Sequence, residues 1–200
     1  MRSLLVLALL TAAAPVFADD HVIDVDDERC AAYVPNELDE SMRAWDQVLS
    51  FAACIQDSTV AKIGEDEDPS VTVAMLAHRL SPAIALYFAS IQHGPSWVQL
   101  RAAYEIGLAH VTLVTRARAS LPSSASVEQR ERLEAAVAQY AETAWMVFAA
   151  IDRAARQDPA MAPDPVTRFM VLDARRMLGV LAEHAPAELG TRDAPMDSEE

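Results

Sequence analysis

Five polar side chains interrupt the apolar stripes of predicted helices, and their chemistry could form a site. They are His78, Arg79, Glu105, His110 and Asp173. Imidazole and carboxylate groups can hold a metal ion or exchange protons, so these residues could line a polar pocket inside a helical bundle. The alternative is structural, because a buried charge must be paired, and Arg79 could pair with Glu105, Glu142 or Asp173. Metal sites in bundles commonly use Glu-x-x-His pairs, and neither that spacing nor His-x-x-x-His occurs in the chain.

The tripeptide Asp19-Asp20-His21 is a second candidate, provided that the residues before it are removed. A free amino terminus, two backbone amides and the imidazole of the third residue then supply four nitrogen ligands in one plane. Cu(II) and Ni(II) favour that geometry. Over these three residues the chain resembles the amino-terminal copper- and nickel-binding motif of serum albumins. The alternative is an ordinary histidine in an acidic segment.

The first 18 residues predict the cleavage that would expose Asp19. Arg2 is followed by an unbroken apolar run over residues 4–10, and Val16 and Ala18 occupy the two positions that a signal peptidase recognises. The run is shorter than the roughly 20 residues that span a bilayer, so residues 1–18 are expected to be a secretory signal peptide rather than a membrane anchor. The composition suggests a bacterial protein. We expect it to be periplasmic or secreted, without membrane insertion after cleavage.

The chain contains two cysteines, Cys30 and Cys54, and export to an oxidising compartment favours a disulfide between them. In the chain-entropy model a loop of this size stabilises the folded protein by about 3.5 kcal/mol. The chain has no Cys-x-x-Cys spacing to lower the pKa of a thiol, so we expect a structural bridge rather than a redox-active pair.

The chain carries a formal net charge of −14, from 30 acidic and 16 basic residues. Half of the acidic residues lie in three clusters, within residues 19–28, 65–68 and 188–200. Nucleic acids and anionic membranes require a concentrated basic face, which the scattered arginines do not indicate. The excess of negative charge instead favours a basic protein as the partner.

Apolar residues recur at steps of three and four, which predicts an all-α protein folded as a compact bundle of about five helices. We expect an acidic extended lead-in over residues 19–35, a helical domain over 36–186 and an acidic flexible tail over 187–200. The helices are predicted at about 36–57, 69–92, 96–120, 127–157 and 165–185. The second is apolar on almost all sides, so it should be central, and it should be kinked or broken at Pro82. In the last helix, Phe169-Met170 and Val180-Leu181 are expected to face inward.

The chain contains no nucleophile elbow, Ser-x-x-Lys pair, phosphate loop or dinucleotide fingerprint. We therefore expect a non-enzymatic exported protein that binds another macromolecule, in a chaperone-, inhibitor- or immunity-like role. Two alternatives remain open. One is a binder of a metal or small ligand, through the amino terminus or the polar pocket. The other is an enzyme whose histidine and carboxylate site assembles only in space.

The amino-terminal motif predicts that mature protein beginning at Asp19 binds one equivalent of Cu(II) through His21. Replacing the imidazole removes one of four ligands, so His21→Ala should bind Cu(II) far more weakly, whereas His93→Ala should bind it unchanged. A spectroscopic copper titration measures both variants, on protein whose first residue has been established by amino-terminal sequencing. Equal affinities for His21→Ala and the unsubstituted protein would contradict the motif.

Overall fold

The structure, a computed structural model, describes residue 30 and residues 42–58, 68–158, 162 and 164–186. Five α-helices make up most of these residues: α2 (Met42–Ser58), α3 (Pro69–His93), α4 (Ser96–Ser120), α5 (Val127–Gln157) and α6 (Pro165–Val180). A short 3-10 helix, η3 (Ala182–His184), follows α6. The described residues contain no β-strand, and the predicted all-α bundle is confirmed.

Side-chain caps explain where three of the helices begin. The carboxylate of Asp68 accepts a hydrogen bond from a backbone N–H in the first turn of α3. Ser126 and Gln129 form a capping box at the start of α5. Asp164 forms a second box with Thr167 at the start of α6. Each cap uses residues within three positions of one another, so the sequence alone predicts these starts correctly.

The last α-helix ends earlier than expected, at Val180 rather than near residue 185. Gly179, a poor helix former, directly precedes the end. Leu181 leaves the helical conformation with its side chain buried against the core. The chain then turns through η3.

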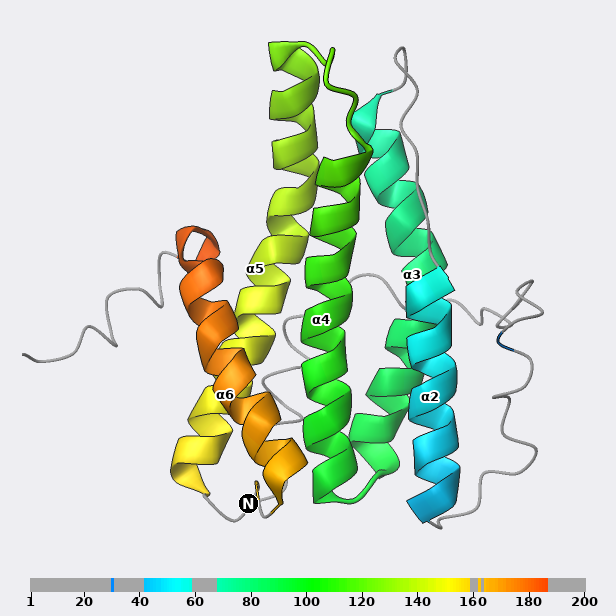
Figure 1. Cartoon of the computed structure of the whole chain (residues 1–200), viewed down its shortest axis with the longest axis vertical. Coiled ribbons are helices and arrows are strands. Elements are labelled where there is room, and N and C mark those ends of the chain that lie inside the picture. The colour runs from blue at the N-terminus through cyan, green and yellow to red at the C-terminus, as the bar shows by residue number, and fades with distance from the viewer. Residues whose placement is uncertain (1–29, 31–41, 59–67, 159–161, 163, 187–200) are drawn as a thin grey trace, which may run out of the picture.

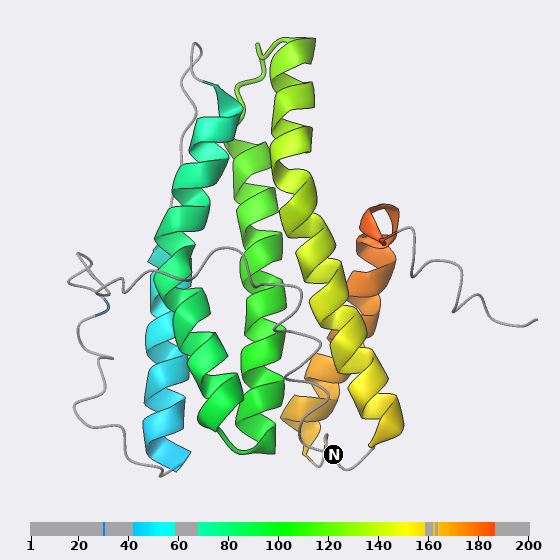
Figure 2. The ribbon, with the colours of Figure 1, turned by 180° about the vertical axis from the view of Figure 1, so that it is seen from behind.

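Helices α3, α4 and α5 run the length of the molecule, and α2 and α6 flank one half of it (Figure 1). α2 packs on α3 and α4, whereas α6 packs on α5 and α4, so α4 contacts every other α-helix. The two flanking helices lie on opposite sides of α4, as the view from behind also shows (Figure 2). The buried apolar residues form two clusters, a larger one to which all five helices contribute and a smaller one between α3, α4 and α5.

α3 is the central helix that the sequence predicts, and it continues through Pro82. Because proline has no N–H, the helical hydrogen bond to the carbonyl of His78 is missing, and the two halves of α3 run at an angle (Figure 2). Among the described helices, α3 is the one long and apolar enough to cross a membrane. Its position between α2, α4 and α5 accounts for the same composition, because a helix covered by neighbours needs no polar face.

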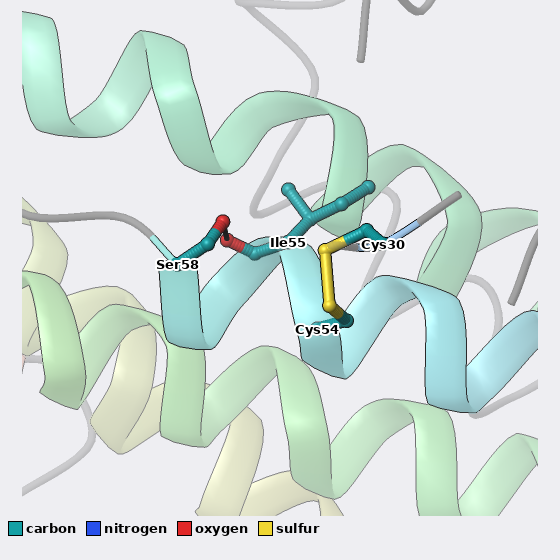
Figure 3. The surroundings of a disulfide bond; sticks show 4 residues. All are labelled: Cys30, Cys54, Ile55 and Ser58. Atoms are coloured by element: carbon teal, nitrogen blue, oxygen red, sulfur yellow. Dashed lines mark hydrogen bonds between the residues drawn. A yellow bond between two sulfur atoms is a disulfide. The ribbon is translucent and has the colours of Figure 1, made fainter. Parts of the chain in front are cut away.

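Cys30 and Cys54 form the predicted disulfide, which joins the lead-in to α2 (Figure 3). Their Cα atoms lie 5.7 Å apart, within the usual range for a bridge. Cys30 is fully buried, so the bridge also extends the apolar core. Beyond Cys54, the hydroxyl of Ser58 donates a 3.0 Å hydrogen bond to the carbonyl of Ile55 in the last turn of α2. The predicted helix start at Asn36 lies outside the described residues.

α4 and α5 approach each other closely at Gly107. A Cβ atom at this position would lie 2.7 Å from Cε1 and Cζ of Phe148 on α5. The Phe148 ring is fully buried and packs edge-on against Tyr104, with ring centroids 6.1 Å apart. The absence of a side chain at Gly107 therefore allows the aromatic ring to lie directly on the backbone of α4.

Gly107→Ala should lower the free energy of unfolding by about 1–3 kcal/mol, because the new methyl group would overlap the Phe148 ring in a well-packed core. Gly179→Ala is the matched control, since a Cβ atom there meets nothing within 4 Å. It should raise the free energy of unfolding by up to about 1 kcal/mol through helix propensity. Urea denaturation followed by circular dichroism measures both. Shifts of the same sign and size would contradict the close contact.

Candidate functional site

α6 lies at one edge of the bundle, against α4 and α5 (Figure 1). Its buried apolar side chains join the larger core cluster: Met170, Val171, Ala174 and Met177. The spacing of these residues places them on one face of a helix. α6 therefore docks through a single face, and its opposite face points away from the bundle.

A hydrogen bond from Tyr104 on α4 fixes α6 in this position. The hydroxyl of Tyr104, a buried residue of α4, donates to Oδ2 of Asp173 across 2.8 Å. Burial and this hydrogen bond both raise the pKa of the Tyr104 hydroxyl, so it remains protonated and able to donate. Arg176 contacts the other oxygen of the same carboxylate, with Nε 3.3 Å from Oδ1. Asp173 thus joins α6 to α4 and orients an arginine of its own helix.

Asp152 on α5 provides a second polar link to α6. Its carboxylate pairs with Arg175 of α6 and with Arg156 of α5, whose Nη2 lies 2.7 Å from Oδ2. Burial alone would raise the pKa of Asp152, but the hydrogen bonds from the two arginines outweigh burial and hold the pKa below its usual value. The carboxylate is therefore ionised, and both guanidinium groups stay beside the contact between α5 and α6.

The side of α6 that points away from the bundle carries most of the exposed apolar side chains. Six large apolar side chains in the described part of the chain are at least 61% exposed, and four of them lie on α6. These four, which we call the α6 outer face, are Val166, Phe169, Leu172 and Val180.

The prediction that Phe169 and Val180 face inward is wrong. Their neighbours Met170 and Leu181 are the buried members of each pair. Consecutive residues of a helix lie about 100° apart, so the burial of one apolar residue does not require its neighbour to be buried as well. These pairs of neighbouring apolar residues are the sequence signal for an outer face. They give α6 more apolar positions than one buried stripe can hold.

Three of the predicted pocket residues lie in unrelated surroundings. His78 and Arg79 are exposed on α3. The argument that a buried Arg79 must pair with a carboxylate therefore does not apply to it. His110 on α4 is partly buried, and its Nδ1 donates a 2.8 Å hydrogen bond to the carbonyl of Ile106. Its ring lies beside Tyr140 of α5, with centroids 6.1 Å apart. Burial lowers the pKa of the His110 imidazole.

Glu105 lies partly buried on another side of α4. Burial raises the pKa of its carboxyl group, the positive charge of Arg101 opposes the rise, and the negative charge of Asp57 adds to it. At 3.6 residues per turn, Glu105 and His110 project from α4 about 140° apart. They therefore project toward different parts of the bundle, and sequence spacing alone could not assign the neighbours of each.

The described residues contain no group of three or more His, Cys, Asp and Glu side chains that could hold a metal ion. The amino-terminal candidate, Asp19-Asp20-His21, lies outside the described residues, so its copper binding stays a prediction. Within the described part of the chain, the α6 outer face is the feature that points most directly to a function.

The charge of the helical bundle differs from that of the whole chain. The described residues contain 13 acidic residues and 12 arginines, a formal charge of −1. The other 17 acidic and 4 basic residues carry −13 of the total charge of −14. The acidic clusters of the sequence thus lie almost entirely outside the described helices, and the surface around α6 is not part of them.

No protein-family model, curated protein or solved structure matches this chain. A function must therefore be inferred from the α6 outer face and the groups around it.

The raised pKa of Glu105 predicts a pH-dependent gain in stability for Glu105→Gln. A carboxyl group whose pKa is higher in the folded than in the unfolded protein destabilises the fold when ionised. This cost is present at neutral pH and disappears as the pH falls through the folded pKa. Glu105→Gln should raise Tm at pH 7 by about 1–4 °C, and by almost nothing below about pH 4.

Thermal unfolding at several pH values measures this difference. Glu142→Gln, at an exposed position of α5, is the matched control and should leave Tm nearly unchanged throughout. A lower Tm for Glu105→Gln at pH 7 than for the parent protein would contradict the interpretation.

Proposed function

We propose that this protein is a non-enzymatic binding protein that contacts another polypeptide through the α6 outer face. The observation that carries the proposal is the concentration of four exposed, large apolar side chains on one helix at the edge of the bundle. Contiguous apolar surface is unfavourable in water, and on folded proteins it commonly marks an interaction site. Scattered exposed apolar residues, such as Val71 and Val127, carry no such meaning.

The attachment of α6 to the bundle supports this function. Tyr104 and Asp152 connect α6 to α4 and α5, respectively, and the buried side of α6 packs into the larger core cluster. A binding surface that is already ordered loses less conformational entropy on association. None of the four outer residues belongs to the buried core, so all four are available to a partner.

We further propose that binding takes place outside the cytoplasm, in the periplasm or beyond. The disulfide between Cys30 and Cys54 is compatible with an oxidising compartment, and residues 1–18 predict a signal peptide. Chaperone-, inhibitor- and immunity-like roles would all use an exposed apolar face of this kind. A basic partner would have to be attracted by the acidic clusters, which lie away from α6 in sequence or follow it after residue 186.

Site-specific photo-crosslinking in the cells that make the protein tests this proposal. A photoreactive phenylalanine analogue at Phe169 or Val180 should give adducts with the same second polypeptide, identified by mass spectrometry. The same analogue at Ala138, an exposed position of α5, is the control and should not give that adduct. Introducing Leu172→Asp should abolish the adduct, because a carboxylate within the interface loses its hydration.

Two results would contradict the proposal. One is the absence of adducts from both α6 positions under conditions in which the analogue is incorporated. The other is an identical set of adducts from Ala138, which would indicate random collisions rather than a binding surface.

A further inference from the structure

The α6 outer face is bordered by arginines whose charged groups point toward solvent. Arg156 and Arg175 share the carboxylate of Asp152, and Arg176 contacts Asp173. The side chains of Arg156, Arg175 and Arg176 are 72%, 44% and 75% exposed, respectively. Those of Asp152 and Asp173 are only 9% and 15% exposed. A partner that approaches α6 therefore meets guanidinium groups, whereas the carboxylates that orient them lie underneath.

Arg176 and a further arginine, Arg168, adjoin the apolar residues directly. Arg176 lies one helical turn after Leu172 and one turn before Val180, within the apolar stripe itself. Arg168 is exposed one turn before Leu172, and its Nε donates to the backbone carbonyl of Asp164 rather than to a carboxylate. The surface thus combines apolar groups with positive charge over the length of α6, about 24 Å at 1.5 Å per residue.

The net charge of the bundle does not cancel this local pattern. The described residues carry a formal charge of −1, so the exposed arginines around α6 are not outweighed by a large negative charge on the described helices. At physiological salt, charges beyond about 8 Å are largely screened, so a docked partner responds mainly to the groups beside it. The overall acidity of the chain therefore does not decide the charge of the partner for this face.

A second copy of the chain fits the face poorly. In a two-fold dimer the same patch meets itself. The guanidinium groups of Arg175 and Arg176 are exposed, whereas the carboxylates of Asp152 and Asp173 are mostly covered, so self-association would bring these like charges together. A partner with apolar side chains and exposed carboxylates would match both components of the surface.

We propose that the α6 outer face binds an acidic amphipathic helix of another polypeptide, whose apolar stripe covers Phe169 and Leu172 and whose carboxylates pair with Arg168 and Arg176. A helix packed along α6 would cover the apolar stripe along its length, as helices do in grooves and bundles. This inference rests on the proposed function and adds the chemistry of the partner to it.

Fluorescence anisotropy with designed peptides tests the inference on the full chain. The probe is a labelled 18-residue helical peptide with leucines on one face and glutamates beside them; the comparison peptide has lysines in place of the glutamates. At low salt (about 50 mM NaCl) the glutamate peptide should bind at least about tenfold more tightly than the lysine peptide, and the difference should shrink as salt is added.

Substitutions on α6 separate the contribution of apolar contact to binding from that of charge pairing. Leu172→Ser should weaken both peptides, because it removes apolar contact. The double variant Arg168→Gln, Arg176→Gln should remove most of the preference for the glutamate peptide. Arg132→Gln, at an exposed arginine of α5 that pairs with Glu128, is the matched control and should leave both affinities unchanged. Circular dichroism establishes that each variant keeps its helical content.

Several results would overturn the inference. Equal affinities for the two peptides, or a preference for the lysine peptide, would exclude an acidic partner. Binding of phosphatidylglycerol vesicles without discrimination between the peptides would indicate a membrane surface as the occupant. A dimer in sedimentation experiments that Leu172→Ser dissociates would indicate a second copy.

The chain's own carboxylates at residues 188–200 are tested as competitors in the same assay. Changing them to amides should leave the affinity for the glutamate peptide nearly unchanged; a large gain in affinity would mean that this segment is the occupant. The peptide experiment and the crosslinking experiment can fail independently of each other. If crosslinking at Phe169 succeeds but the peptides are not distinguished, α6 is a binding surface for a partner of different charge.

Discussion

The close packing of α4 between its neighbours is the constraint on which the rest of this structure depends. α4 contacts every other α-helix, and at Gly107 its backbone lies directly against the Phe148 ring of α5. The three long helices bury their apolar sides against one another, and this leaves α4 with room on both flanks for one more helix. α2 fills one flank with the help of a disulfide, and α6 fills the other with the help of two polar links. The position of the candidate binding surface follows from this order of packing.

Much of the fold could be predicted from the sequence because the signals are local. Asp68, Ser126 and Asp164 each cap a helix with partners no more than three residues away, and the disulfide was expected from two cysteines and a predicted export signal. The directions of individual side chains could not be predicted in the same way. Helical periodicity gives the angle between Glu105 and His110 around α4, but it does not say which helix lies opposite each one. Periodicity therefore could not show whether the five predicted pocket residues share one site.

The candidate site was missed for a related physical reason. A run of apolar residues predicts burial, and α6 has enough of them to suggest burial on several sides, yet an edge helix can bury only one. Phe169 and Val180 were assigned to the core because their neighbours belong there. The net charge has a similar limit as a guide, since a sum over the sequence does not say which part of the molecule carries it. Most of the −14 lies outside the described helices, and the groups beside α6 are predominantly guanidinium groups at the surface.

The separation of the two faces of α6 has a consequence for how this protein could diversify. Met170, Ala174 and Met177 pack in the larger core cluster, whereas Phe169 and Leu172 are each 61% exposed and belong to neither buried cluster. Substitutions at the outer positions should thus be nearly neutral for stability while changing which surfaces are complementary to the helix. A lineage could replace its partner through a few codon changes within this one helix, without first acquiring compensating mutations in the core. Related proteins would then share the bundle and differ in specificity.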